Sequence, residues 1–155
     1  MINVLFVCHG NICRSPMAEF IFKDYVKKEN LQDKIYVESA ATSREEIGAR
    51  VHRETKRQLQ IHGIYDFEQK RARQIDRYDY DKFDYIIVMD SLNMRNIKYI
   101  IPNDMGSKIY KLLDFTPRGG DIADPWYTGD FDTTYNEINE GCKYLLAHIR
   151  KKYDL

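Results

Sequence analysis

The segment from Cys8 to Ser15 brings a thiol, a glycine, an asparagine and a guanidinium close together in the chain. Gly10 and Asn11 tolerate a positive φ, which a tight loop needs if its backbone N–H groups are to surround an anion. Arg14 can offer a planar fork to two phosphate oxygens, and Cys8 can attack phosphorus as a thiolate. We therefore predict a phosphate-binding loop with Cys8 as nucleophile and Arg14 as clamp. The other members of the predicted loop are His9, Gly10, Asn11, Ile12, Cys13 and Ser15.

Such a reaction also needs a proton for the leaving oxygen, and Asp124 is the candidate donor. Pro125 biases the backbone of Asp124 towards an extended conformation and stiffens its aim. Trp126 and Tyr127 could wall the pocket and stack on an aryl phosphate. A solvated Asp-Pro turn is the alternative interpretation, and Asp121 and Asp130 are weaker candidates for the acid.

The chain alternates strand-like and helix-like segments, which predicts how these residues are positioned. The apolar run over residues 2–7 is typical of a strand buried on both faces of a parallel sheet. Ser15 is expected to cap a helix, with Pro16 at its first position, running to about residue 28. Further strands are predicted at 35–39, 85–89 and 109–113. Further helices are predicted in the later part of 45–62, at 91–101 and at 132–153, with a long loop over 114–130 and a loop or short helix over 69–80.

This order of elements predicts an α/β fold with a doubly wound, open parallel sheet in one domain over residues 1–155. Ligands in such sheets bind beyond the carboxyl ends of the strands, and Cys8 follows the first strand directly. Charged residues make up 31% of the chain and cancel to a net charge of zero, so no overall field for nucleic acid or a membrane surface is expected.

Three cysteines, Cys8, Cys13 and Cys142, argue against a disulfide framework or a zinc site. The apolar N-terminal run is too short for a signal peptide or a membrane span, so a cytoplasmic location is expected. There a thiol can stay reactive. A buried, inert core thiol remains the alternative interpretation of Cys8.

Several segments resemble the low-molecular-weight protein tyrosine phosphatases. The similarity is most specific at Val7 to Glu19 and at Asp124-Pro125-Trp126-Tyr127. It extends to Glu38-Ser39-Ala40, His62-Gly63-Ile64, Ala72 to Ile75, and Met89-Asp90 with Asn93. The resemblance implies a flavodoxin-like three-layer sandwich with a four-stranded parallel sheet, and a phosphotyrosine phosphatase that needs no metal or cofactor.

The resemblance also implies roles for individual residues. Cys8 would be the nucleophile, Arg14 the phosphate clamp, and Asp124 first the general acid and then the base for water. Asn11 would support the loop through hydrogen bonds to Ser15, Ser39 and either Asp90 or His62. From the residues alone, His62 is better interpreted as capping the end of a helix. Cys13 would be a redox partner that captures an oxidised Cys8 as a disulfide, although it could simply pack under the loop.

The chain departs from the family at the pocket rim. Arg44, Glu45 and Glu46 stand where an aromatic residue is common, so Ile47 or a charged stem is expected to join Trp126 and Tyr127 there. The expected partners are phosphotyrosine-containing proteins, with phosphate or vanadate as inhibitors, and the chain is expected to be a monomer or weak dimer.

Two alternatives stay open. A thiol-coupled arsenate reductase has the same fold but needs further relay cysteines, and no cysteine lies between Cys13 and Cys142. A non-catalytic phosphotyrosine-binding module would have lost the nucleophile or the acid, and both are present.

Overall fold

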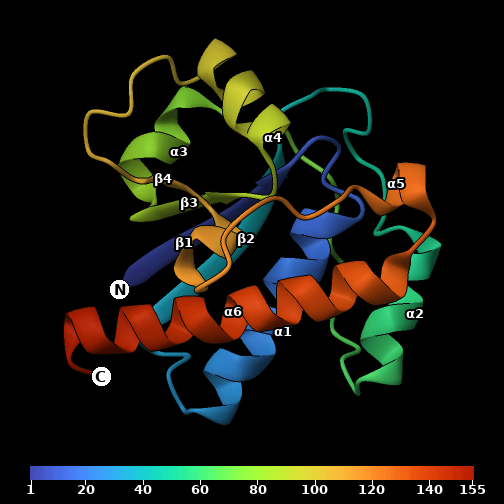
Figure 1. Cartoon of the computed structure of the whole chain (residues 1–155), viewed down its shortest axis with the longest axis horizontal. Coiled ribbons are helices and arrows are strands. Elements are labelled where there is room, and N and C mark those ends of the chain that lie inside the picture. Colours follow the sequence, from blue (N-terminus) through green and yellow to red (C-terminus); the bar gives the residue numbers. More distant parts are fainter.

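Four parallel strands form one sheet in the order β2-β1-β3-β4 (Figure 1). The computed structural model describes residues 1–155. In chain order its elements are β1 (Ile2–Cys8), α1 (Arg14–Lys28), β2 (Ile35–Ala41), α2 (Arg53–Ile61), α3 (Arg77–Lys82), β3 (Tyr85–Val88), α4 (Ser91–Asn96), η1 (Ile97–Tyr99), β4 (Ile109–Lys111), η2 (Leu112–Phe115), α5 (Pro125–Thr128) and α6 (Phe131–Tyr153). The predicted α/β, flavodoxin-like fold with a four-stranded parallel sheet is confirmed.

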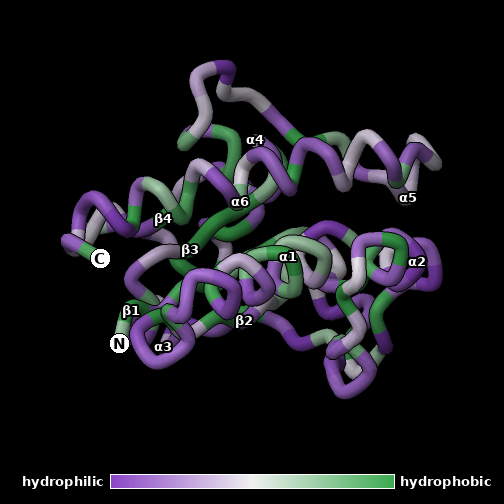
Figure 2. The backbone as a smooth tube through the Cα atoms, turned by 90° about the horizontal axis from the view of Figure 1, so that it is seen from below, coloured by the Kyte–Doolittle hydropathy of each residue, from purple (hydrophilic) through white to green (hydrophobic).

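The central strand β1 is apolar along most of its length because both of its faces are covered. Val4 and Phe6 belong to a core cluster that also contains side chains of α1 and α6. Leu5 and Val7 belong to a second cluster on the opposite face, with residues that follow α3 and α4. Figure 2 shows β3 as mainly hydrophobic, in contrast to the long helix α6, which alternates hydrophobic and hydrophilic residues.

The order in which strands join the sheet reverses at β1, because β2 is added on one side of it and β3 on the other, and this gives the sheet its natural binding position. β1 pairs with β2 on one side and with β3 on the other, so the loops after β1 and β3 leave the sheet edge side by side. In Figure 1 the loop after β1 and the segment leading into α5 meet beyond this edge. Cys8, the last residue of β1, therefore lies at the topological switch point, where ligands of open α/β sheets bind.

The predicted start of α1 is wrong by two residues. The helix begins at Arg14, Cys13 occupies the N-cap without a side-chain cap hydrogen bond, and Pro16 lies in the first turn. Ser15 does not cap the helix because its hydroxyl is engaged by Asn11 and Cys8. A proline fits this turn because the first N–H groups of a helix have no intrahelical acceptor.

Other boundaries also differ from the sequence prediction. The strand predicted at 109–113 ends at Lys111 and continues as η2, and the helix predicted at 91–101 ends as the 3-10 turn η1. The segment 114–130, expected to be a loop, includes the short helix α5. In the ambiguous segment 69–80, Gln74 forms an isolated bridge to Ala41 at the end of β2, and residues 77–80 already belong to α3.

Helix α6 packs closely on η2, and a glycine permits this approach. A Cβ atom placed on Gly141 would lie 2.5 Å from Leu112 Cγ, well inside van der Waals contact. Leu112 is fully buried, so its side chain has little room to move away. None of the helices combines the length and apolar character needed to cross a membrane.

We predict that Gly141→Ala lowers the free energy of unfolding by about 1–3 kcal/mol, because overpacking outweighs the ~1 kcal/mol that alanine usually gains over glycine in a helix. Chemical denaturation followed by circular dichroism measures this change. The matched control is the same substitution in a Leu112→Ala background, where the added methyl group fills part of a cavity and should be neutral or stabilising. Stabilisation in the wild-type background would contradict the packing argument.

Candidate active site

The loop between β1 and α1 turns on Asn11, the one non-glycine residue of this loop with a positive φ, at 60°. Gly10 does not have a positive φ, so the expectation that both residues would adopt this conformation is wrong for Gly10. Asn11 is fully buried. Its backbone conformation is rare for a residue with a side chain, and hydrogen bonds of its amide hold it in place.

The side chain of Asn11 joins three segments of the chain. Its Nδ2 donates to Ser15 Oγ at 2.8 Å and to Ser39 Oγ at 2.9 Å, and its Oδ1 accepts from the backbone N–H of Arg73 at 3.2 Å. These hydrogen bonds of the Asn11 amide therefore hold the loop against β2 and against the segment after α2.

The loop offers its backbone donors to an anion. The N–H groups of residues 9–13 donate to no other protein atom, and the Ser15 N–H points to Cys8 Sγ at 3.4 Å. The first N–H groups of α1 lie at the same place and add the positive end of the helix dipole. This arrangement suits a bound phosphate or another oxyanion.

The thiol of Cys8 lies at the base of this loop. It is 3% exposed, and its sulfur is 3.0 Å from Ser15 Oγ. A hydroxyl and a backbone N–H therefore converge on one sulfur atom. The arrangement can support nucleophilic attack by the sulfur.

Arg14 is 2% exposed and is held by hydrogen bonds from one side. Nη1 donates to Asp90 Oδ2 at 2.6 Å and to the backbone oxygen of Ile122 at 2.7 Å, while Nη2 is 3.4 Å from Asp124 Oδ2. Burial opposes the guanidinium charge, but Cys8, Asp90 and Asp124 outweigh it and raise the pKa of Arg14. The guanidinium is therefore charged and rigidly aimed before any ligand arrives.

Asp124 reaches the same pocket from the far end of the chain. Its Oδ1 caps the short helix α5 by accepting from the Trp126 N–H at 3.0 Å, which leaves Oδ2 towards Arg14. The segment before it is tied to β3 because the Ile122 N–H donates to Met89 O at 3.0 Å. The carboxyl is thus positioned by its own cap and by the sheet edge.

One hollow brings the predicted nucleophile, clamp and acid together. Its lining residues are Cys8, His9, Gly10, Ile12, Cys13, Arg14, Glu45, Glu46, Asp124, Trp126 and Tyr127. The rim is formed by charged stems rather than by Ile47, which is exposed and lies outside the lining. Glu45 Oε2 lies 2.9 Å from His9 Nε2. Glu46 passes within van der Waals reach of Gly10, where a Cβ would lie 3.4 Å from its Cγ.

Two residues expected to support Asn11 have other partners. Asp90 caps α4 through the Asn93 N–H and otherwise binds Arg14. The ring of His62 stacks on Tyr135 at 3.8 Å, and its Nδ1 is 2.9 Å from the backbone oxygen of Gln58. His62 therefore belongs to the end of α2, as the residues alone indicated, and the role that the resemblance implied is wrong.

Cys13 lines the same hollow as Cys8. Burial, together with the neighbouring Cys8 and Asp124, raises the pKa of Cys13 to about 12. The thiol is therefore protonated near neutral pH. No group of three or more His, Cys, Asp or Glu side chains is arranged to hold a metal ion.

The sequence analysis missed several supporting groups of the site. Glu19, Lys70 and Arg73 surround the buried side of the loop, and the backbone oxygen of Ile122 holds Arg14. Glu19 could have been recognised from the sequence as a residue with a buried polar partner, because a carboxylate among the apolar residues of a helix that covers a core needs one. The partner itself comes from tertiary structure.

Comparison with known proteins gives a consistent result along the whole chain. Residues 3–155 match the family model described as low molecular weight phosphotyrosine protein phosphatase. The chain is 43% identical over 157 aligned residues to the low molecular weight protein-tyrosine-phosphatase YfkJ of Bacillus subtilis, and the alignment covers all of both proteins.

Solved structures agree with this result. The crystal structure of YfkJ from Bacillus subtilis superposes with a TM-score of 0.94 at 44% identity, covering 98% of this chain and 96% of the other. The structure of DARP, described as a drosophila arginine phosphatase, has a TM-score of 0.85 at 34% identity, covering 95% and 97%. The backbone and the loop positions are therefore shared with proteins whose named substrates differ.

We predict that Arg14→Lys weakens the binding of inorganic phosphate by about tenfold or more, because a lysine cannot present two parallel N–H donors. Isothermal titration calorimetry measures the affinity directly. The control is Arg44→Lys, which makes the same change at an exposed position outside the lining of the hollow. Equal phosphate affinity in the Arg14→Lys protein would rule out Arg14 as the clamp.

Proposed function

The chain belongs to the low molecular weight phosphotyrosine protein phosphatases, and from this premise we propose that it hydrolyses phosphotyrosine through a cysteinyl-phosphate intermediate on Cys8. The observation that carries the proposal is the convergence on one hollow of the Cys8 sulfur, the Arg14 guanidinium and the Asp124 carboxyl. Aryl phosphates bound there would meet a nucleophile, a clamp and an acid at once.

In the first step the Cys8 thiolate attacks phosphorus, an S–P bond forms, and the P–O bond to the tyrosine ring breaks. Asp124 gives its proton to the departing phenolate oxygen, so the product leaves as a neutral phenol. The N–H groups of the loop and the Arg14 fork stabilise the charge on the three equatorial oxygens.

In the second step water attacks the phosphorus of the intermediate, and the S–P bond breaks. Asp124, now a carboxylate, takes a proton from that water. The hydroxyl of Ser15, 3.0 Å from the sulfur, would donate to the departing thiolate and return it to its starting state. Phosphate is then released, and inhibition by phosphate or vanadate follows from the same cradle.

The walls of the hollow are suited to a flat ring. Trp126 and Tyr127 are both mostly exposed and lie beside Asp124. Trp126 is steadied from behind by His52, whose ring meets it edge to face at 5.8 Å. An aromatic leaving group can stack against these side chains, which supports phosphotyrosine as the substrate class.

We also propose that Cys13 protects Cys8 from oxidation. A sulfenic acid on Cys8 would react with the Cys13 thiol to form a disulfide, with loss of one water. The two thiols line one hollow, which supports this pairing. The raised pKa of Cys13 favours a slow capture, because the thiolate is the reactive form.

An arsenate reductase remains the weaker alternative. It would need a further cysteine to relay the disulfide, and Cys142 is fully buried in the core, where its sulfur faces the backbone oxygen of Ala18. Burial also raises the pKa of Cys142. These observations support the phosphatase over a thiol-coupled reductase.

We predict that Cys8→Ser lowers the rate of hydrolysis of a phosphotyrosine peptide by at least about a thousandfold. Release of inorganic phosphate measures the rate, with a phosphoarginine peptide tested beside it because one structural relative is named an arginine phosphatase. Residual activity above about one per cent of the wild type would remove Cys8 from the mechanism. Faster release from phosphoarginine would overturn the proposed substrate class.

We predict that Asp124→Asn slows the first step most for substrates with poorly departing phenols, because these need the proton most. Rapid-quench kinetics on aryl phosphates with phenols of different acidity gives the dependence. Asp121→Asn is the control, since that carboxylate pairs with Lys111 and lies outside the hollow. A uniform loss of rate across the series would argue against Asp124 as the acid.

A further inference from the structure

A continuous row of buried hydrogen bonds leads from Glu19 on α1 to the sulfur of Cys8. Ser39 Oγ donates to Glu19 Oε1 at 2.6 Å, and Asn11 Nδ2 donates to Ser39 Oγ at 2.9 Å. The same Asn11 nitrogen donates to Ser15 Oγ at 2.8 Å, and Ser15 Oγ is 3.0 Å from Cys8 Sγ. Each of the five side chains is at least nine-tenths buried, so water does not compete for these bonds.

The direction of every bond in this row follows from its far end. A carboxylate only accepts, so the Ser39 proton must point to Glu19, and the lone pairs of Ser39 are left for Asn11. The Asn11 nitrogen then also donates to Ser15. Since Ser15 Oγ already accepts, its own proton is free for Cys8 Sγ at 3.0 Å or for the backbone oxygen of Ala40 at 3.3 Å.

The charge at the far end is held by two lysines. Lys23 Nζ is 2.5 Å from Glu19 Oε2, and Lys70 Nζ is 3.7 Å from Glu19 Oε1. Lys70 Nζ also donates to the backbone oxygen of Ser39 at 2.7 Å. Burial lowers the pKa of Lys70, yet Glu19 favours its charge. The other charged groups beside this cluster are Arg73 and Glu38.

We propose that Glu19 is a positioning residue for the nucleophile: through Ser39, Asn11 and Ser15, it directs the Ser15 hydroxyl proton onto Cys8 Sγ. This rests on the proposed function only in taking Cys8 as the nucleophile. Glu19 is not among the residues that line the hollow.

The proposal makes a prediction opposite to that of simple electrostatics. Removing a negative charge near Cys8 should, through space, favour the thiolate and move its formation to lower pH. Removing the fixed acceptor at the end of the row should instead free Ser39 to reorient, weaken the Ser15 donor and move thiolate formation to higher pH. The sign of the change therefore separates the two effects.

The experiment measures the pH dependence of Cys8 alkylation by iodoacetamide, read at Cys8 by peptide mass spectrometry. Glu19→Gln keeps the size of the side chain but can turn an N–H₂ group towards Ser39. We expect its alkylation midpoint to rise by about one pH unit relative to the wild type. The groups that face Cys8 directly, Arg14, Asp124 and Cys13, are unchanged in this variant.

A second variant and a double-mutant cycle separate the proposed effect from a general loss of structure. Ser39→Ala breaks the row while keeping the Glu19 charge, and should raise the midpoint by a similar amount. Adding Glu19→Gln to Ser39→Ala should then cause no further rise, because the row is already interrupted. Asp24→Asn is the matched control, since Asp24 pairs with Lys28 four residues on, as Glu19 pairs with Lys23, but belongs to no such row.

An unchanged or lowered midpoint in Ser39→Ala, or additive rises in the double variant, would overturn the proposal. An unchanged or lowered midpoint in a folded Glu19→Gln protein would also overturn it, and a lowered midpoint would assign the effect to charge alone. Alkylation does not depend on turnover, so a failure here is distinct from a failure of the proposed phosphatase activity. With phosphotyrosine peptide, kcat should fall at neutral pH while KM stays close to the wild-type value.

Discussion

The structure depends on one constraint: the loop after β1 must turn its backbone N–H groups inward, and it does so through a left-handed residue in a fully buried position. Asn11 supplies the conformation, and its amide supplies three hydrogen bonds that hold it. A backbone held this way costs free energy of order 1–3 kcal/mol, which the surrounding contacts must offset. The loop is therefore assembled before any ligand binds, and little reorganisation is left for the moment of reaction.

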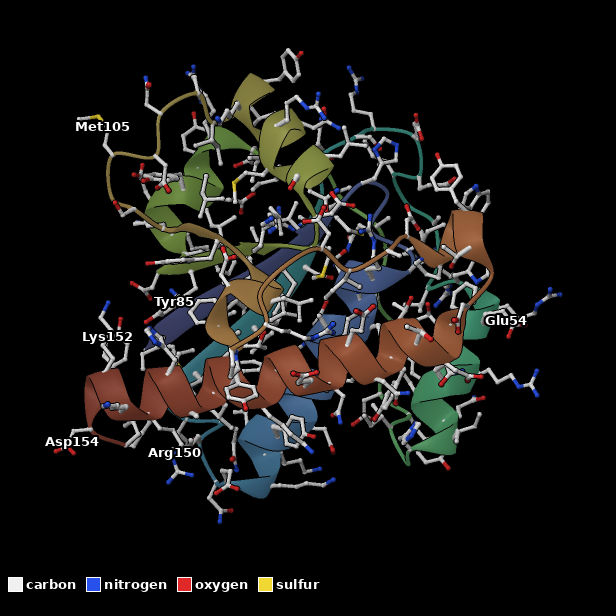
Figure 3. All side chains as sticks on the ribbon, viewed as in Figure 1. Glu54, Tyr85, Met105, Arg150, Lys152 and Asp154 are labelled. Carbon is white, nitrogen blue, oxygen red and sulfur yellow. The ribbon has the colours of Figure 1, made fainter.

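Arg14 connects this loop to the other segments of the site through its hydrogen bonds. One nitrogen of its guanidinium joins the end of β3, through Asp90, to the segment before α5, through the Ile122 backbone. The other nitrogen faces Asp124. Three residues that are far from Arg14 in sequence thus contact the same buried guanidinium. Figure 3 illustrates the contrast with the outer surface, where Met105 projects from the loop between α4 and β4 into open space.

The candidate site residues of this chain are easier to identify from the sequence than the contacts that support them. The sequence singles out Cys8, Arg14 and Asp124 because their residue types and local context are unusual. It also predicts β1, because a short, continuous apolar run is typical of a strand buried on both faces. The helix start was misplaced because Ser15 satisfies a tertiary partner instead of a local one. The residues alone place His62 at the end of a helix, but they do not identify Tyr135 as the partner of its ring or Arg14 as the partner of Asp90, because these contacts arise only from tertiary packing.

The division between a buried floor and an exposed rim has a consequence for how this protein can change over generations. Asn11, Arg14 and Ser15 are buried and bonded to other parts of the chain, Asn11 to Ser15 and Ser39 and Arg14 to Asp90 and Ile122. A substitution at one of them therefore disturbs several segments. Glu45, in the loop after β2, and Trp126 and Tyr127, both on α5, stand mostly in solvent. Surface positions of this kind tolerate substitution at little cost in stability. Selection can therefore change which molecules this hollow accepts by replacing rim residues one at a time, while the buried loop beneath them stays intact.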